Sequence, residues 1–320
     1  MALNASGPIS LAGTTTGQSI EIELLGNGTT TISLNDSTVR TLAGVASGQI
    51  AMPGDFYGKS NTFNLTISSN QTNLNLNSFA VSSGWNGSSN LVVTINSGVY
   101  VYSTSTANAG LIISGSFPNG LSLINNGYIM GMGGQGVAAV SGNGSAGGVA
   151  IYLGTNLTLT NNSYIGGGGG GGGGYLGGGG AGGGPGGGSG SSTGGAGGGP
   201  GSAGGNGGGA NPGGGGGGRI IPGTGGDWST GGGAGGGGGH QAAASGQHGY
   251  GGSAGNPGTN GIATGFNYIG GGGGGWGASG GYGGYHGANN GSGGAGGKAI
   301  ELNGYSVTYL ATGTIYGAVS

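Results

Sequence analysis

Few residues of this chain have side chains that carry reactive chemistry, and these residues are widely spaced. The 320 residues include six acidic, four basic and three histidine side chains, and no cysteine. His240, His248 and His286 lack HxxH and HExxH spacing and have no carboxylate cluster beside them, so we expect no metal site. Asp227 and Glu301 are the only carboxylates after residue 55, and neither has an evident partner for hydrolysis. We therefore expect a protein that is not an enzyme and needs no cofactor.

Other familiar motifs are also missing. Residues 54–60 (GDFYGKS) resemble a phosphate-binding loop, but three residues separate the two glycines where four are needed. The four basic residues are too scattered to form a nucleic-acid-binding surface. No apolar run approaches the roughly 20 residues that span a membrane, and the first residues do not form a secretory signal. We expect no nucleic acid, no membrane insertion and folding in the cytoplasm where the chain is made.

Side chains suited to recognising another molecule lie among the glycines of the second half. Arg219 is followed within ten residues by Asp227 and Trp228, so a cation, an anion and an indole are close in sequence. Aromatic side chains give large contact areas at low entropic cost and can stack on sugar faces. They can equally cover the glycine segments or lock loops, and the sequence leaves both interpretations open. The candidate binding residues are Tyr175, Arg219, Asp227, Trp228, His240, His248, Tyr250, Phe266, Tyr268, Trp276, Tyr282, Tyr285 and His286.

Glycine dominates the part of the chain that carries these residues. Of the 101 glycines, 85 follow position 130, and they include nine in a row from Gly166 to Gly174. Such a segment has almost no side chains to bury, so its backbone groups must bond to one another if it folds. A free glycine tract would be a flexible linker, but a linker has no use for the large residues between the blocks. Collagen is excluded because glycine does not recur strictly at every third position.

The remaining interpretation is a bundle of polyglycine-II helices. Such helices have three residues per turn, a rise of about 3.1 Å per residue and no internal hydrogen bonds. Every N–H and C=O group therefore points sideways towards a neighbouring helix. We predict this bundle for residues 166–297, with loops alternating between its two ends.

The first 130 residues predict β structure. Residues 20–24 and 30–34 have strand character and flank the turn 26–28, which predicts a hairpin. Residues 91–95 and 99–102 flank the turn 96–98 and predict a second hairpin. Residues 39–43 could form a short helix or a strand.

An internal repeat brackets the glycine region. Residues 124–129, 160–165 and 310–315 share a turn-forming pair followed by a final isoleucine. The flank 148–153 (GVAIYL) is similar to 297–302 (GKAIEL). We expect both copies to join one β structure, so the glycine segment starts and ends at the same place.

The fold class expected is a mostly β N-terminal part followed by packed polyglycine-II helices, with almost no α-helix. Five segments follow from this pattern. They are an N-terminal β module (1–60), a β-rich middle domain (61–130), a β bracket (131–165), the polyglycine-II bundle with its loops (166–297) and C-terminal strands that return to the bracket (298–320).

The glycine blocks from Gly166 to Gly297, with aromatic residues in the loops between them, resemble phage tail-fibre adhesins of the polyglycine-sandwich type. Residues 8–13 (PISLAG), 33–36 (SLND) and 55–60 (DFYGKS) are similar to the starts of other phage structural proteins. The resemblance implies attachment to the tail-fibre shaft through the N-terminal region and a location at the tail-fibre tip of the virion. It also implies that loops at the far end bind a bacterial surface protein or polysaccharide.

Two other functions remain open at this stage. The chain could be a structural virion protein, such as a spike or head decoration, in which the glycine bundle is a rigid spacer. It could also be an ice-binding protein, although that function needs a flat face with regular Thr or Ala spacing, and Thr is irregular after Thr193.

Overall fold

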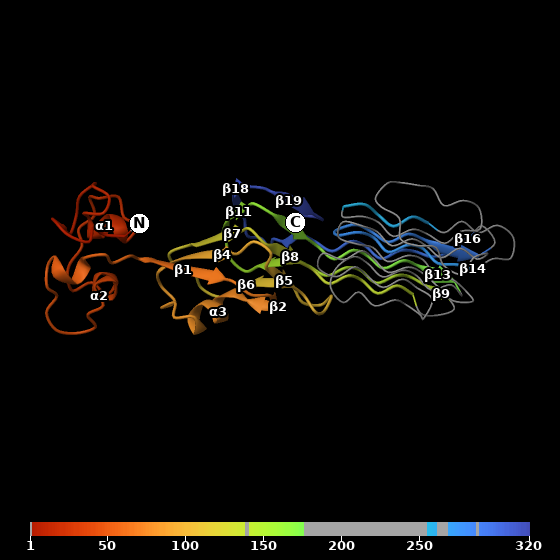
Figure 1. Cartoon of the computed structure of the whole chain (residues 1–320), viewed down its shortest axis with the longest axis horizontal. Coiled ribbons are helices and arrows are strands. Elements are labelled where there is room, and N and C mark those ends of the chain that lie inside the picture. The colour runs from red at the N-terminus through yellow and green to blue at the C-terminus, as the bar shows by residue number, and fades with distance from the viewer. Residues whose placement is uncertain (1, 138–140, 176–254, 261–267, 286–287) are drawn as a thin grey trace. The chain divides into compact units, whose positions relative to one another are not determined.

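The computed structural model describes residues 2–137, 141–175, 255–260, 268–285 and 288–320 (Figure 1). The chain divides into two compact units, residues 1–65, 80–93 and 116–122 on one hand and residues 66–79, 94–115 and 123–320 on the other. Strands β1 (Thr62–Ile67), β4 (Asn90–Ile95) and β7 (Leu121–Asn125) each begin in the first unit and end in the second.

The first 60 residues form helices α1 (Ile20–Glu23) and α2 (Ser37–Ala43) and the 3₁₀ turn η1 (Gly54–Phe56). The predicted hairpin over 20–34 is therefore wrong, whereas the helical alternative for 39–43 is correct. Ser19 caps α1, its Oγ accepting from the Ile22 N–H at 3.3 Å, and the buried Glu21 carboxylate accepts from the backbone of Asn27 and Gly28. The alternation Ile-Glu-Ile-Glu indicates a strand by its period, but Glu21 and Glu23 are both buried in the structure. Apolar residues of these elements share one core, which consists of Leu3, Ile9, Ile20, Val39, Leu42, Ala43 and Phe56.

Residues 62–130, 150–166 and 300–320 form a parallel β-solenoid, whose coils pass through three sheets. The sheet orders are β1-β4-β7-β11-β18, β2-β5-β8-β12-β19 and β3-β6-β10-β17. The strands not yet bounded are β2 (Gln71–Thr72), β3 (Leu74–Asn75), β5 (Tyr100–Tyr102), β6 (Leu111–Ile113), β8 (Tyr128–Met130), β10 (Ile151–Leu153), β11 (Leu157–Asn161), β12 (Tyr164–Gly166), β17 (Ile300–Glu301), β18 (Val307–Ala311) and β19 (Thr314–Tyr316). Helix α3 (Leu76–Ser82) lies between β3 and β4 in the chain.

The second predicted hairpin is wrong for a topological reason. Strands β4 and β5 belong to different sheets, and each pairs with strands of the neighbouring coils instead of with each other. The turn 96–98 is thus a corner of a coil. Short alternating strands beside a glycine turn give the same local pattern in both cases.

The repeat expected from the sequence is present as stacked strands. Strand β10 pairs with β17, β11 with β18 and β12 with β19, all parallel. Equivalent apolar residues align through the interior, for example Leu111, Ile151 and Ile300, each fully buried. At one corner two buried amides also stack, with Asn125 Nδ2 donating to Asn161 Oδ1 at 2.8 Å.

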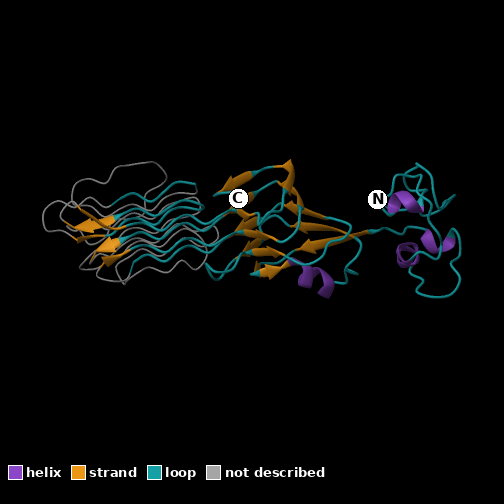
Figure 2. Cartoon of the chain, turned by 180° about the vertical axis from the view of Figure 1, so that it is seen from behind, coloured by secondary structure: helices purple, strands orange, loops and turns teal. Residues whose placement is uncertain are grey.

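Extended glycine-rich segments, here called threads, leave the solenoid at one corner of its coils and return there. The described threads are residues 131–137, 143–149, 167–173, 255–260, 270–276, 278–282 and 292–299. The first two lie between β8 and β10 and the others between β12 and β17. In Figure 2 they appear as near-parallel teal strings between the solenoid and a group of short strands.

Backbone hydrogen bonds link each thread to several neighbours with a period of three residues. The N–H groups of Gly168 and Gly171 donate to thread 143–149, whereas those of Gly170 and Gly173 donate to thread 278–282. Carbonyls of the same thread accept from residues 134 and 137, from 271, 274 and 277, and from 294 and 297. Bonds in several directions that repeat every third residue are what a threefold extended helix makes with its neighbours.

Most side chains of the threads lie where a thread faces outward, and Val137, Trp276 and Ala299 are buried exceptions. Gly166 to Gly174 are all buried, and a Cβ on Gly168 would overlap the Met132 carbonyl oxygen. The peripheral thread 292–299 has glycine at inner positions, but Ser292, Ala295 and Lys298 recur every third residue and are partly or fully exposed. Glycine is therefore required by close backbone approach.

Candidate functional site

The threads define two ends, one joined to the solenoid (the proximal end) and one remote from it (the distal end). Thread 167–173 leaves strand β12, and thread 270–276 runs back beside it, with Gly271, Gly274 and Gly277 donating to Gly173, Gly170 and Gly167. The two threads therefore run in opposite directions. Figure 1 places short strands at the distal end of these threads.

The distal strands bring separate parts of the chain together. They are β9 (Ser141–Gly142), β13 (Gly174–Tyr175), β14 (Tyr268–Ile269), β15 (Gly283–Tyr285) and β16 (Ala288–Gly291). Strand β13 pairs antiparallel with β9, and β14, β15 and β16 form a three-stranded antiparallel sheet. A bridge between Gly174 and Gly270 joins the two groups.

Three of the predicted binding residues meet in these strands. Tyr268 and Tyr285 are direct cross-strand partners, and Tyr175 is paired with Ser141 on the adjoining ribbon. These positions lie up to 110 residues apart in the sequence, so only the return of the threads makes them neighbours. The distal strands with Tyr175, Tyr268 and Tyr285 are the candidate functional site.

Two other predicted residues lie on described threads. Tyr282 is 43% exposed, and its N–H donates to Asn260 Oδ1 at 3.0 Å. Trp276 lies at the proximal end and is fully buried, with its indole against the Cα of Gly166. The indole is therefore not accessible to a receptor, and the locking interpretation fits it. The remaining predicted residues, Arg219, Asp227, Trp228, His240, His248, Tyr250, Phe266 and His286, lie outside the described residues.

The described part of the chain offers little other chemistry. Its aspartate and glutamate side chains form no group of three that could hold a metal ion. No described helix is both long and apolar enough to cross a bilayer. Lys298 and Glu301 form an ion pair at 3.2 Å.

Sequence reasoning missed a ladder of stacked tyrosines on the solenoid. Tyr100, Tyr128, Tyr164 and Tyr316 stack with ring centroids 4.8, 5.6 and 6.3 Å apart. Tyr128 and Tyr164 occupy equivalent places in the internal repeat, which was the available signal. Their faces contact one another, so the ladder rigidifies the sheet that carries threads at its edge.

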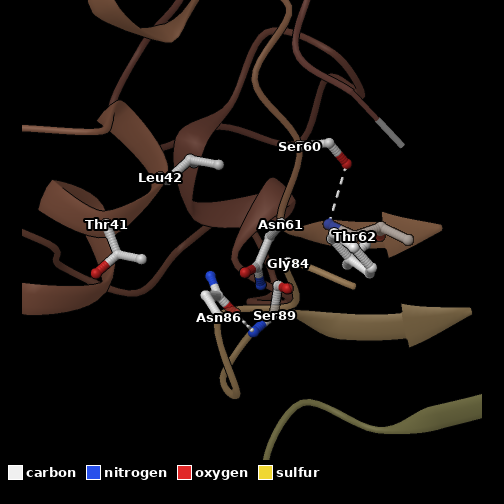
Figure 3. Close-up of a pocket in the computed structure, with 9 residues that line it drawn as sticks. Thr41, Leu42, Ser60, Asn61, Thr62, Gly84, Asn86 and Ser89 are labelled. Atoms are coloured by element: carbon white, nitrogen blue, oxygen red, sulfur yellow. Dashed lines mark hydrogen bonds between the residues drawn. The ribbon is translucent and has the colours of Figure 1, made fainter. Parts of the chain in front are cut away.

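A small polar pocket in the first unit was also missed. It has a volume of about 140 Å³, and its lining includes Thr41, Ser60, Asn61, Asn86 and Ser89 (Figure 3). Asn61 Nδ2 is buried there and has no hydrogen-bond partner in the described part of the chain. The Glu23 carboxylate lies beside Asn61, with Glu23 Oε1 accepting from the Asn61 N–H at 2.8 Å. A pocket of this size suits a few water molecules.

Comparison with known proteins identifies the family. The model of a family described as phage tail fibre adhesin Gp38 matches residues 62–320. The crystal structure of the gp37-gp38 adhesin tip complex of the bacteriophage S16 long tail fiber is similar, with 22% identity, coverage of 97% of this chain and 100% of that chain, and a TM-score of 0.46. A comparison with curated proteins finds no match. Because the family match spans more than half of its residues, the chain belongs to the phage tail fibre adhesins described as Gp38.

Proposed function

We propose that this phage tail fibre adhesin binds a host-surface receptor through the distal end of its glycine threads. The observation that carries the proposal is the convergence of Tyr175, Tyr268 and Tyr285 on paired strands at that end. Tyrosine combines a large apolar ring with a hydroxyl group, which suits contact with either protein or sugar. The receptor is a bacterial outer-surface protein or polysaccharide.

The chain segments that follow or precede these strands contain further candidate residues from the sequence. Residues 261–267, which include Phe266, connect an outward thread to β14, and residues 286–287, which include His286, connect β15 to β16. Arg219, Asp227, Trp228, His240, His248 and Tyr250 remain candidates from the sequence. Trp276 is left out because it is buried.

The threads act as a rigid support made of polyglycine-II helices. The three-residue period of their lateral hydrogen bonds supports this conformation. Seven residues of such a helix extend about 22 Å at a rise of about 3.1 Å each. The support holds the binding strands away from the solenoid and contributes no chemistry of its own, so the protein is a binding protein without catalytic activity.

The N-terminal region attaches the adhesin to the fibre. Residues 1–61 lie outside the family match, and residues 1–60 have their own apolar core. We assign this region to the tail-fibre shaft protein, which puts the adhesin at the tip of the fibre. The solenoid of residues 62–130, 150–166 and 300–320 then carries the threads, and the expected segment 131–165 is divided, since residues 131–137 and 143–149 are threads.

A loop exchange tests the proposal. Residues 255–260 pair with neighbouring threads, so removal of the whole segment 256–268 would also disturb the support. We therefore replace only residues 261–267 by seven glycine and serine residues and measure adsorption of the phage to host cells. Adsorption should fall at least tenfold while virions assemble with complete fibres. The matched control replaces the exposed solenoid residues 106–108 by Gly-Ser-Gly. Normal adsorption of the loop variant would exclude residues 261–267 from the receptor surface, and normal adsorption of a variant with Tyr175→Ser, Tyr268→Ser and Tyr285→Ser would refute the proposal.

A further inference from the structure

Glycine threads have a register problem. Thread 167–173 and residues 270–275 consist only of glycine, and they bond through Gly271, Gly274 and Gly277 to Gly173, Gly170 and Gly167. A slide by three residues would give each N–H and C=O another partner of the same kind. Register is weakly specified in glycine-rich segments because no side chain distinguishes one alignment from another. Something other than backbone pairing must therefore set the alignment.

Trp276 is the only residue of thread 270–276 that has a side chain. Its indole lies on the Cα of Gly166, the last residue of β12, so closely that a Cβ on Gly166 would overlap the indole ring. The indole is fully buried there. Gly166 is thus a notch in the sheet, and Trp276 fills it.

Backbone contacts at the proximal end hold the turn that follows. Gly277 has φ of +66°, and it packs against Gly317, which follows β19. The Gly277 N–H donates to Gly167 O at 2.7 Å, and the Trp276 carbonyl accepts from Gly255 at 2.9 Å. Gly166, Gly167 and Gly317 together form a seat on the solenoid for residues 276–277.

We propose that Trp276 is the positioning residue that fixes the register of the returning thread and thereby the position of the distal strands. The seat accepts one indole at one place, so a slide by three residues would lift Trp276 out of the notch. At a rise of about 3.1 Å per residue, such a slide moves Tyr268 by about 9 Å along the bundle. The inference rests on the proposed function, since it explains how the receptor-binding strands are held in place.

Distance measurement tests the register directly. The chain has no cysteine, so Asn162→Cys on the solenoid and Tyr268→Cys on β14 give one spin-labelled pair. Double electron–electron resonance on the full chain should give one distance. In the Trp276→Ala background we expect a second population displaced by about 9 Å, while Trp276→Phe keeps one population. Tyr152→Ala, which removes a 38% exposed aromatic from the solenoid, is the matched control and should leave the distance unchanged. One unchanged distance in Trp276→Ala would overturn the inference.

A second variant keeps the indole. Deletion of residues 272–274 shortens the thread by one helical turn and preserves the three-residue period. If the proximal seat sets the register, the labelled position 268 moves by about 9 Å towards the solenoid as one population. If position 268 keeps its distance, the register is set at the distal end and the inference is wrong.

Adsorption by the unlabelled Trp276→Ala phage separates the two proposals. A second distance population with at least tenfold weaker adsorption supports both. A second population with normal adsorption supports the register inference and refutes the receptor role of the distal strands. An unchanged distance with weak adsorption refutes the register inference alone.

Discussion

The solenoid and the glycine threads are held together by opposite means, although both consist of extended chain. In the solenoid, side chains such as Leu111, Ile151 and Ile300 fill an interior between sheets. In the threads, backbone groups bond in several directions and leave no room for a Cβ. Glycine loses more conformational freedom on folding than any other residue. The comparison teaches that lateral backbone hydrogen bonds, such as those of thread 167–173, can hold a segment that has no side chains to bury.

The corners of the solenoid coils anchor both ends of the glycine threads. Threads leave after β8 and β12 and return before β10 and β17, so equivalent corners of successive coils carry them. In the preceding coil only residues 103–110 separate β5 from β6 at that place. A regular stack of corners thus anchors segments of very different length without altering the sheets.

The largest expected effect comes from adding one carbon to a buried thread. Gly168→Ala would place a Cβ against the Met132 carbonyl oxygen, and neither backbone can move without breaking hydrogen bonds. We expect a loss of more than about 3 kcal/mol and loss of amide-exchange protection in residues 166–174. Gln135→Ala, at an exposed position of a peripheral thread, is the control and should stay within about 0.5 kcal/mol of the parent protein. Full protection in Gly168→Ala would contradict the close-packed description.

The second prediction concerns a cavity in the interior of the solenoid. Leu159→Ala leaves a cavity at a fully buried position of β11, which should lower the free energy of unfolding by about 3 kcal/mol. Urea unfolding measures the loss. Thr158→Ala, on the opposite face of the same strand, should cost much less. Equal losses of unfolding free energy for the two variants would contradict the burial of Leu159 in the solenoid interior.

A smaller effect should follow at the corner with stacked amides. Asn161→Ala leaves Asn125 Nδ2 without its 2.8 Å partner and the Thr312 carbonyl without its 2.7 Å donor. Buried groups that lose a hydrogen bond cost about 2 kcal/mol. The neighbour Asn162 bonds Asn126 at an exposed position, so Asn162→Ala serves as the control in the same unfolding experiment. Similar losses of unfolding free energy for both variants would show that burial of the Asn125–Asn161 hydrogen bond adds no stability.

The smallest effect concerns alkaline pH. Burial raises the pKa of Tyr309 on β18 above its ordinary value of about 10. The unfolded chain then releases the tyrosine proton first, so stability is constant below pH of about 10 and falls as the pH rises towards the higher folded-state pKa. Tyr309→Phe should reduce this fall in thermal unfolding midpoints above pH of about 10. Leu310→Ala, which changes an exposed neighbour that does not titrate, should keep it. An identical pH profile for Tyr309→Phe would show that Tyr309 does not contribute.

Local sequence patterns predicted which residues form strands better than they predicted which strands pair with one another. The repeat at 124–129, 160–165 and 310–315 identified stacked strands, because coils that stack must repeat the same inward residues. The hairpins at 20–34 and 91–102 failed, since an alternating segment beside a turn does not say which strand lies next to it. Trp276 and Tyr268 looked alike in sequence, yet the first is at the proximal end and the second at the distal end. The direction of the thread decides this, and direction depends on how many times the chain has crossed the bundle.

The sequence by itself determined that residues 166–174 could pack only through their backbone, because nine consecutive glycines have no side chains to bury. It also determined that the glycine segment begins and ends at one β structure, because the flanking repeats are alike. Only the tertiary structure decided that Tyr175, Tyr268 and Tyr285 lie on neighbouring distal strands and that Trp276 fills the notch at Gly166. The physical reason is that backbone hydrogen bonds between glycine threads are alike at every residue. Neighbours are therefore chosen by the corners and seats of the solenoid, which bring together residues far apart in the chain.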